Sequence, residues 1–170
     1  MNSEKLRAIQ SPLKSRYKDD PESAVITLSS EGKIGNGITC KVDTGKAMVE
    51  AGLHPATGGD GMAACSGDML LDALVACAGV TLIAVATAIS VDLRKDTRIT
   101  ADGDLDFRGT LGVDKEAPVG FKEIRLTFHL DTDAGDEQIA SLIKLTERYC
   151  VVFQTLNNGP EMVTDVEIIE

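Results

Sequence analysis

The sequence predicts a single α+β domain, and two features of the chain predict this class. Segments in which apolar and polar residues alternate lie on both sides of an uncharged, alanine-rich stretch, residues 73–89. The predicted strands are grouped at the two ends of that stretch and do not alternate with helices as βαβ units would. We therefore expect antiparallel strands, a long central helix, and a further antiparallel β layer with an amphipathic helix.

The N-terminal part predicts an arm followed by a β-meander. Residues 1–22 are polar and contain two prolines, so we expect an arm that is ordered only by packing on something else. Residues 23–53 alternate in short runs separated by glycines, which predicts strands at 24–28, 38–42 and 47–49. The outer edge of this meander would be exposed in a monomer.

Residues 66–90 predict the central helix. It follows a glycine-rich loop, with Ser66 as the expected N-cap and Asp68 in the first turn. Apolar side chains face every direction, so we expect the helix to be buried on all sides. The uncharged stretch is short and rich in alanine for a membrane span. One chain has little material to surround such a helix, which favours a two-fold homodimer.

Residues 97–170 predict a β-β-α-β lobe that completes the domain spanning 1–170. Alternation predicts strands over 97–107 and 121–130, and apolar residues at helical spacing predict an amphipathic helix over 135–148. A final strand is expected over 163–169.

Composition excludes several function classes. The net charge of −10 and pI near 4.6 exclude nucleic acid and anionic lipid as partners, because both require clustered lysine and arginine. Residues 1–17 lack the apolar run of a signal peptide, so we expect a cytoplasmic protein with no membrane partner. Four cysteines and two histidines without a CxxC spacing predict neither a disulfide scaffold nor a metal site, and no cofactor is expected.

The positions of the cysteines in the sequence, taken alone, suggest that most of them are core residues. Cys77 lies in the apolar helix, where burial raises a thiol's pKa and makes it inert, and Cys150 ends the amphipathic helix. Cys40 is expected to pack on a strand. Cys65, in the glycine-rich loop, is either a surface cysteine or an alternative resolving thiol, and His54 is either exposed or shapes a substrate entrance.

Two segments around these cysteines resemble the OsmC/Ohr-like family, named for osmotically induced protein C and the organic hydroperoxide resistance protein. In residues 66–77 an acidic residue, a Leu-Leu pair and an alanine-rich turn precede Cys77, as they precede the family's peroxidatic cysteine. Residues 147–160 resemble the segment around the resolving cysteine, although the usual Cys-Pro is Cys150-Val151 here. The order of elements agrees across nearly the whole chain.

The resemblance implies an intertwined homodimer that is a thiol-dependent hydroperoxide reductase, a cysteine-based peroxidase acting on organic hydroperoxides. The thiolate of Cys77 would attack the peroxide and become a sulfenic acid, which Cys150 would capture as a disulfide. An external dithiol would then reduce that disulfide. The alternatives are a non-catalytic ligand-binding or stress-response dimer with the same fold, and a purely structural role in an oligomer.

Family members also use an arginine to lower the thiol pKa and a carboxylate to hold that arginine. Arg16 on the arm is the first candidate here, ahead of Arg7, Arg94 and Arg98. The carboxylate candidate is Asp68, one residue nearer the cysteine than in the family. On a continuous helix it would lie about 13.5 Å along the axis from the cysteine, so a helix-start carboxylate is the competing interpretation.

Two geometric expectations follow for the cysteines. A disulfide requires Cα atoms within about 7 Å, so Cys77 and Cys150 should approach that closely. A thiolate in an apolar helix also requires a cation or hydrogen-bond donor from outside that helix. We expect an arginine, Arg16 before the others, from the arm or from a partner chain.

Overall fold

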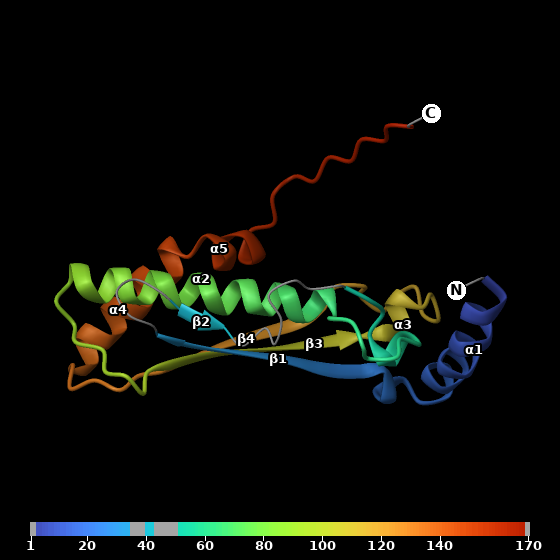
Figure 1. Cartoon of the computed structure of the whole chain (residues 1–170), viewed down its shortest axis with the longest axis horizontal. Coiled ribbons are helices and arrows are strands. Elements are labelled where there is room, and N and C mark those ends of the chain that lie inside the picture. The colour runs from blue at the N-terminus through green and yellow to red at the C-terminus, as the bar shows by residue number, and fades with distance from the viewer. Residues whose placement is uncertain (1–2, 35–39, 43–50, 169–170) are drawn as a thin grey trace.

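The computed structural model describes residues 3–34, 40–42 and 51–168. In these residues one antiparallel sheet has the strand order β2-β1-β3-β4, and helix α2 lies across one face of it (Figure 1). The elements are β1 (Val25–Ile34), β2 (Cys40–Val42), α2 (Ser66–Ala88), β3 (Arg98–Asp106) and β4 (Phe121–His129). The predicted α+β class is confirmed.

The strands on either side of α2 join one sheet, whereas the sequence predicted a separate second layer. β1 pairs with β3 along most of its length, from Val25 opposite Asp106 to Lys33 opposite Arg98. This pairing satisfies backbone groups that two smaller sheets would leave at exposed edges. β4 then pairs with β3, and the ring of Phe121 packs over Gly103, where a Cβ atom would lie 2.4 Å from that ring. The predicted strand at 47–49 lies outside the described residues.

Helix α2 is buried on one face only, so the expectation of burial on all sides is wrong for the single chain. Its sheet-facing side chains include Leu71, Leu74 and Leu82, none more than 1% exposed. Met69 and Val80, on another face, are 40% and 38% exposed. With a mean hydropathy of 2.3 the helix is long and apolar enough to cross a membrane, but its packing on the sheet is that of a core helix.

Two helices follow the sheet and pack against α2. The amphipathic α4 (Asp136–Tyr149) confirms the predicted helix and buries Leu142 completely. A second helix, α5 (Val151–Asn157), was not predicted. Cys150 separates them with an extended backbone, φ −74° and ψ 108°, so the chain turns at this residue.

The N-terminal arm forms helix α1 (Ser3–Asp19) and packs at one end of the molecule (Figure 1). Tyr17 is fully buried there, and its hydroxyl donates a 2.6 Å hydrogen bond to the carbonyl of Ala56. The neighbouring short elements are the 3-10 helices η1 (Pro21–Ala24) and η2 (Pro55–Thr57) and the helix α3 (Phe107–Thr110). The arm is therefore ordered by packing, as expected, although its helical form was not predicted.

The C-terminal tail is extended and exposed. The predicted strand at 163–169 is not formed in the single chain: residues 159–168 pair with no strand in the described part of the molecule. Figure 1 shows this tail leaving α5 and pointing away from the body. A lone strand forms only where a neighbouring strand accepts its hydrogen bonds, and none lies beside it here.

Candidate functional site

The structure brings Cys77 and Cys150 together. Cys77 is half-buried in the middle of α2, and Cys150 is 1% exposed at the corner between α4 and α5. Neither is in a disulfide, and their thiols are hydrogen-bonded to each other. The corner places Cys150 beside α2 because α4 and α5 both pack on that helix.

The sulfur of Cys77 is surrounded by hydrogen-bond donors. In order of effect, these are the backbone N–H of Val152, the thiol of Cys150, the backbone N–H of Val151 and the hydroxyl of Thr81. The two backbone groups belong to the first turn of α5, where N–H groups have no partner within their own helix. Thr81 lies four residues after Cys77, on the same face of α2.

These donors decide the ionisation of Cys77. Burial by itself raises the pKa of the Cys77 thiol, but the hydrogen bonds favour the thiolate and together bring the pKa below its ordinary value. The required donors from outside α2 are thus present as backbone N–H groups. Of the four donors, only Thr81 could have been found in the sequence, because it lies four residues after Cys77 on the predicted helix. The N–H groups of Val151 and Val152 point at the sulfur only because α5 begins there, and the sequence did not predict α5.

Cys150 is shifted in the opposite direction. Burial raises the pKa of its thiol to about 11, and the hydrogen bond and negative charge of Cys77 add to this, against an opposing backbone hydrogen bond from Phe153. The pair is therefore asymmetric: Cys77 ionises more readily than an ordinary thiol, and Cys150 ionises less readily and donates a hydrogen bond to it.

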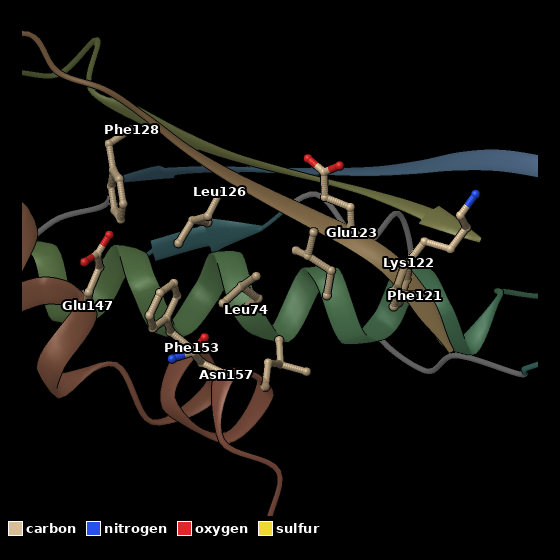
Figure 2. A pocket seen from close by; sticks show the side chains of 11 residues that line it. Leu74, Phe121, Lys122, Glu123, Leu126, Phe128, Glu147, Phe153 and Asn157 are labelled. Carbon is tan, nitrogen blue, oxygen red and sulfur yellow. The ribbon is translucent and has the colours of Figure 1, made fainter. Parts of the chain in front are cut away.

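A cavity of about 330 Å³ lies between β4 and α5 (Figure 2), and neither Cys77 nor Cys150 is part of its wall. Leu74, one helical turn before Cys77, and Phe153, two residues after Val151, contribute to its wall. The lining is largely apolar and aromatic, with Glu147 and Asn157 among its polar members. A small molecule with an apolar body could be held there.

No guanidinium is among the groups that contact Cys77 within the described chain. Arg16 donates to the Tyr17 hydroxyl at 3.2 Å and lies over that ring, and Arg94 is ion-paired with Asp131 at 3.1 Å. Arg98 is exposed at the start of β3. The side chain of Arg7 lies outside the described residues. A single chain therefore activates Cys77 without the arginine that we expected.

The remaining predicted residues lie near the start of α2. Asp68 is in the first turn, as expected, and burial raises its pKa, opposed by His54 and assisted by Asp72. His54 is half-buried and stacks on Phe107 with ring centroids 5.0 Å apart, so it is not simply exposed.

Cys65 is the N-cap residue of α2 in place of Ser66, and it packs partly against the core. It lies twelve residues before Cys77, about 18 Å along the helix, which places it too far away to resolve a sulfenic acid on Cys77. The side chain of Cys40 lies outside the described residues. Among the residues that are described, no group of three or more His, Cys, Asp or Glu side chains is arranged to hold a metal ion.

Comparisons with known proteins agree with this fold. The sequence matches the family described as OsmC-like protein over residues 58–165. A crystal structure of an OsmC-like hydroperoxide resistance protein from Jannaschia sp. CCS1 superposes with a TM-score of 0.64 at 16% identity, covering 85% of this chain and 95% of that one. An OsmC-like protein from Mycoplasma pneumoniae gives 0.55 at 15% identity, covering 79% and 86%. No curated protein sequence matches significantly.

Proposed function

Because this chain belongs to the OsmC-like protein family, we propose that it is a thiol-dependent reductase of organic hydroperoxides. The observation that carries the proposal is the asymmetric pair of thiols. Cys77 has a lowered pKa and Cys150 a raised one, and the two are in contact. A peroxidatic cysteine must be a thiolate to attack an O–O bond, and its resolving partner must be within reach.

In the first step the thiolate of Cys77 attacks the terminal oxygen of the hydroperoxide. An S–O bond forms, the O–O bond breaks, and the departing alkoxide takes a proton and leaves as the alcohol. Sulfur is oxidised by two electrons and the peroxide is reduced by two. The cavity, whose wall includes Leu74 one helical turn before Cys77, would hold the organic part of the substrate.

In the second step Cys150 attacks the sulfenic acid of Cys77, forming the disulfide and releasing water. The charge of the Cys77 thiolate is one cause of the high Cys150 pKa, and this charge disappears when the sulfenic acid forms. Cys150 therefore becomes easier to deprotonate when its thiolate is needed. An external dithiol then supplies two electrons and two protons to restore both thiols.

Peroxide consumption by the purified protein tests the proposal. Cumene hydroperoxide should be consumed with a dithiol such as dihydrolipoamide or dithiothreitol, and Cys77→Ser should abolish turnover. Cys150→Ser should allow one oxidation per chain and then stop, whereas Cys65→Ser is the matched control and should retain turnover. If Cys77 is neither oxidised by a stoichiometric hydroperoxide nor required for turnover, the protein is a non-catalytic binding dimer.

We also propose that the protein is a two-fold homodimer in the cytoplasm. The exposed apolar face of α2, which includes Met69 and Val80, is the surface a second copy would cover. We infer that a second copy brings its Arg16 towards Cys77, so the supporting role of Arg16 depends on the dimer. A direct role for Asp68 would likewise need a second copy. Light scattering at micromolar concentration should give twice the chain mass of 18.0 kDa, and a stable monomer would contradict this assembly.

A further inference from the structure

The hydroxyl of Thr81 is bonded to a side chain of its own helix. In other helical positions of this chain, Thr87 and Thr146 each donate to the carbonyl four residues earlier, at 2.8 Å. Thr81 lies four residues after Cys77, and its hydroxyl donates to the sulfur of that residue. A hydroxyl that donates its hydrogen keeps two lone pairs that can accept. Thr81 can therefore bind a second molecule while it still contacts the thiolate.

Thr81 differs in this respect from the other groups that donate to the sulfur. The backbone N–H groups of Val151 and Val152 can only donate, and the thiol of Cys150 is a weak acceptor. A hydroperoxide carries a hydrogen on its terminal oxygen, which is the oxygen that the thiolate attacks. Among the four donors, the hydroxyl of Thr81 is the strong acceptor for that hydrogen.

Thr81 is also placed where a molecule that reaches the sulfur would meet it. Residues at spacings of three and four lie on the same side of a helix, and Leu74, Cys77 and Thr81 follow this spacing along α2. Leu74 lines the cavity, and Cys77 and Thr81 are both half-buried. A hydroperoxide whose apolar part occupies the cavity would therefore extend along this side of α2 to the sulfur and the hydroxyl.

We propose that Thr81 binds the terminal oxygen of the hydroperoxide, an inference that rests on the function proposed above. Its hydroxyl donates to the thiolate and at the same time accepts the hydrogen of the terminal O–H group. That hydrogen lies to the side of the O–O bond, so the bond itself can point away from the sulfur, in line for displacement. The two contacts hold the terminal oxygen beside the sulfur in the orientation that the attack requires.

This arrangement determines where each proton goes. As the S–O bond forms and the O–O bond breaks, the sulfur is oxidised by two electrons and the peroxide is reduced by two. The hydrogen that Thr81 accepts stays on the terminal oxygen and becomes the hydrogen of the sulfenic acid. Thr81 keeps its own proton, and the departing alkoxide takes one from water. The contact therefore favours peroxides with a terminal O–H group over dialkyl peroxides, which have none.

Two reactions of Cys77 separate peroxide binding from the effect of Thr81 on ionisation. Alkylation by iodoacetamide measures the thiolate, whereas oxidation by cumene hydroperoxide in a single turnover also depends on how the peroxide is held. Thr81→Val removes the hydroxyl and keeps the branched shape. We expect it to slow oxidation about fivefold more than it slows alkylation at the same pH, the effect of one lost hydrogen bond. Both rates are followed on the full-length protein by mass spectrometry of the peptide that contains Cys77.

Two further variants are the controls. Thr81→Ser keeps the hydroxyl and should keep the native ratio of oxidation rate to alkylation rate. Thr87→Val removes an exposed hydroxyl of the same helix that is bonded to the backbone, and it should change neither rate. If circular dichroism shows that Thr81→Val does not fold, Thr81→Ala compared with Thr81→Ser isolates the same hydroxyl.

The inference is overturned if Thr81→Val lowers both rates by the same factor or lowers neither, because Thr81 then acts only on ionisation or not at all. It is also overturned if Thr81→Ser behaves as Thr81→Val does. In these cases oxidation of native Cys77 by the hydroperoxide still supports the proposed function. If native Cys77 is not oxidised, the proposed function and this inference fail together.

Discussion

Replacing Val151 with proline tests whether backbone N–H groups activate Cys77. Val151 is the first residue of α5, the position where a helix accepts proline most readily. Cys150 before it is already extended, at φ −74° and ψ 108°, as a residue before proline needs to be. The substitution therefore removes one hydrogen-bond donor to the Cys77 sulfur and leaves the corner in place.

The size of the effect follows from the contacts of the sulfur. A hydrogen bond to a charged group contributes about 1.5–3 kcal/mol. Cys77 is half-exposed and keeps the stronger donor, Val152, so we expect about 1 kcal/mol from Val151 after discounting for solvent. At pH values below the pKa of Cys77, that is about a fivefold loss of thiolate.

The assay is the rate of alkylation of Cys77 by iodoacetamide across pH, followed by mass spectrometry of the peptide that contains it. At pH values where the rate for the native protein still rises with pH, Val151→Pro should react about fivefold more slowly than the native protein. Val151→Ala keeps the N–H and is the matched control, with an unchanged rate. Equal rates for the proline and native proteins, with circular dichroism showing an intact fold, would refute this account of the activation.

Three other expectations concern the pair, the core and the sheet surface. Cys77→Ser should lower the pKa of Cys150 from about 11 while burial keeps it above the ordinary value, because a neighbouring charge is lost; alkylation of Cys150 against pH checks this, and an unchanged profile contradicts it. Leu142→Ala should lower the free energy of unfolding by roughly 2–5 kcal/mol, because Leu142 is fully buried; a urea titration with a loss below about 1 kcal/mol would argue against that packing. Arg125→Gln should raise the pKa of Asp104, which hydrogen bonds from Arg125 and Thr27 hold at about 2. A depressed folded pKa stabilises the protein above the unfolded value of 3.8, and this stability is lost as pH falls towards 2. The variant keeps the Thr27 hydrogen bond, so it should show a weaker pH dependence when the carboxyl is titrated by NMR and acid unfolding is followed.

The periodicity of apolar residues in the sequence was sufficient to predict the main helix and two of the strands. The uncharged run over residues 73–89 predicted a helix packed on apolar surface, and the alternation in 97–107 and 121–130 predicted amphipathic strands. These local patterns correspond to α2, β3 and β4 within one or two residues. The spacing of apolar residues is a local property of the chain, so it indicates a helix or a strand whatever the tertiary arrangement is.

The candidate site could be predicted from the sequence only in part. Cys77 and Cys150 were singled out through their resemblance to a family, and the fold places them in contact. Arg16 could not be judged in this way, because its position depends on where α1 packs, and α1 packs at its own end of the molecule with Tyr17 in the core. Its approach to Cys77 remains a prediction about a dimer.

By itself, the sequence determined the class of fold and the extents of the main helix and strands, and its family resemblance singled out two cysteines. The tertiary structure decided that β1 pairs with β3, that one face of α2 stays open, and that α5 begins at Val151 with its N–H groups on the Cys77 sulfur. The physical reason is that backbone donors are identical at every non-proline residue. Only the direction of the chain at Cys150 determines where they point, and that direction is fixed by the packing of α4 and α5 on α2.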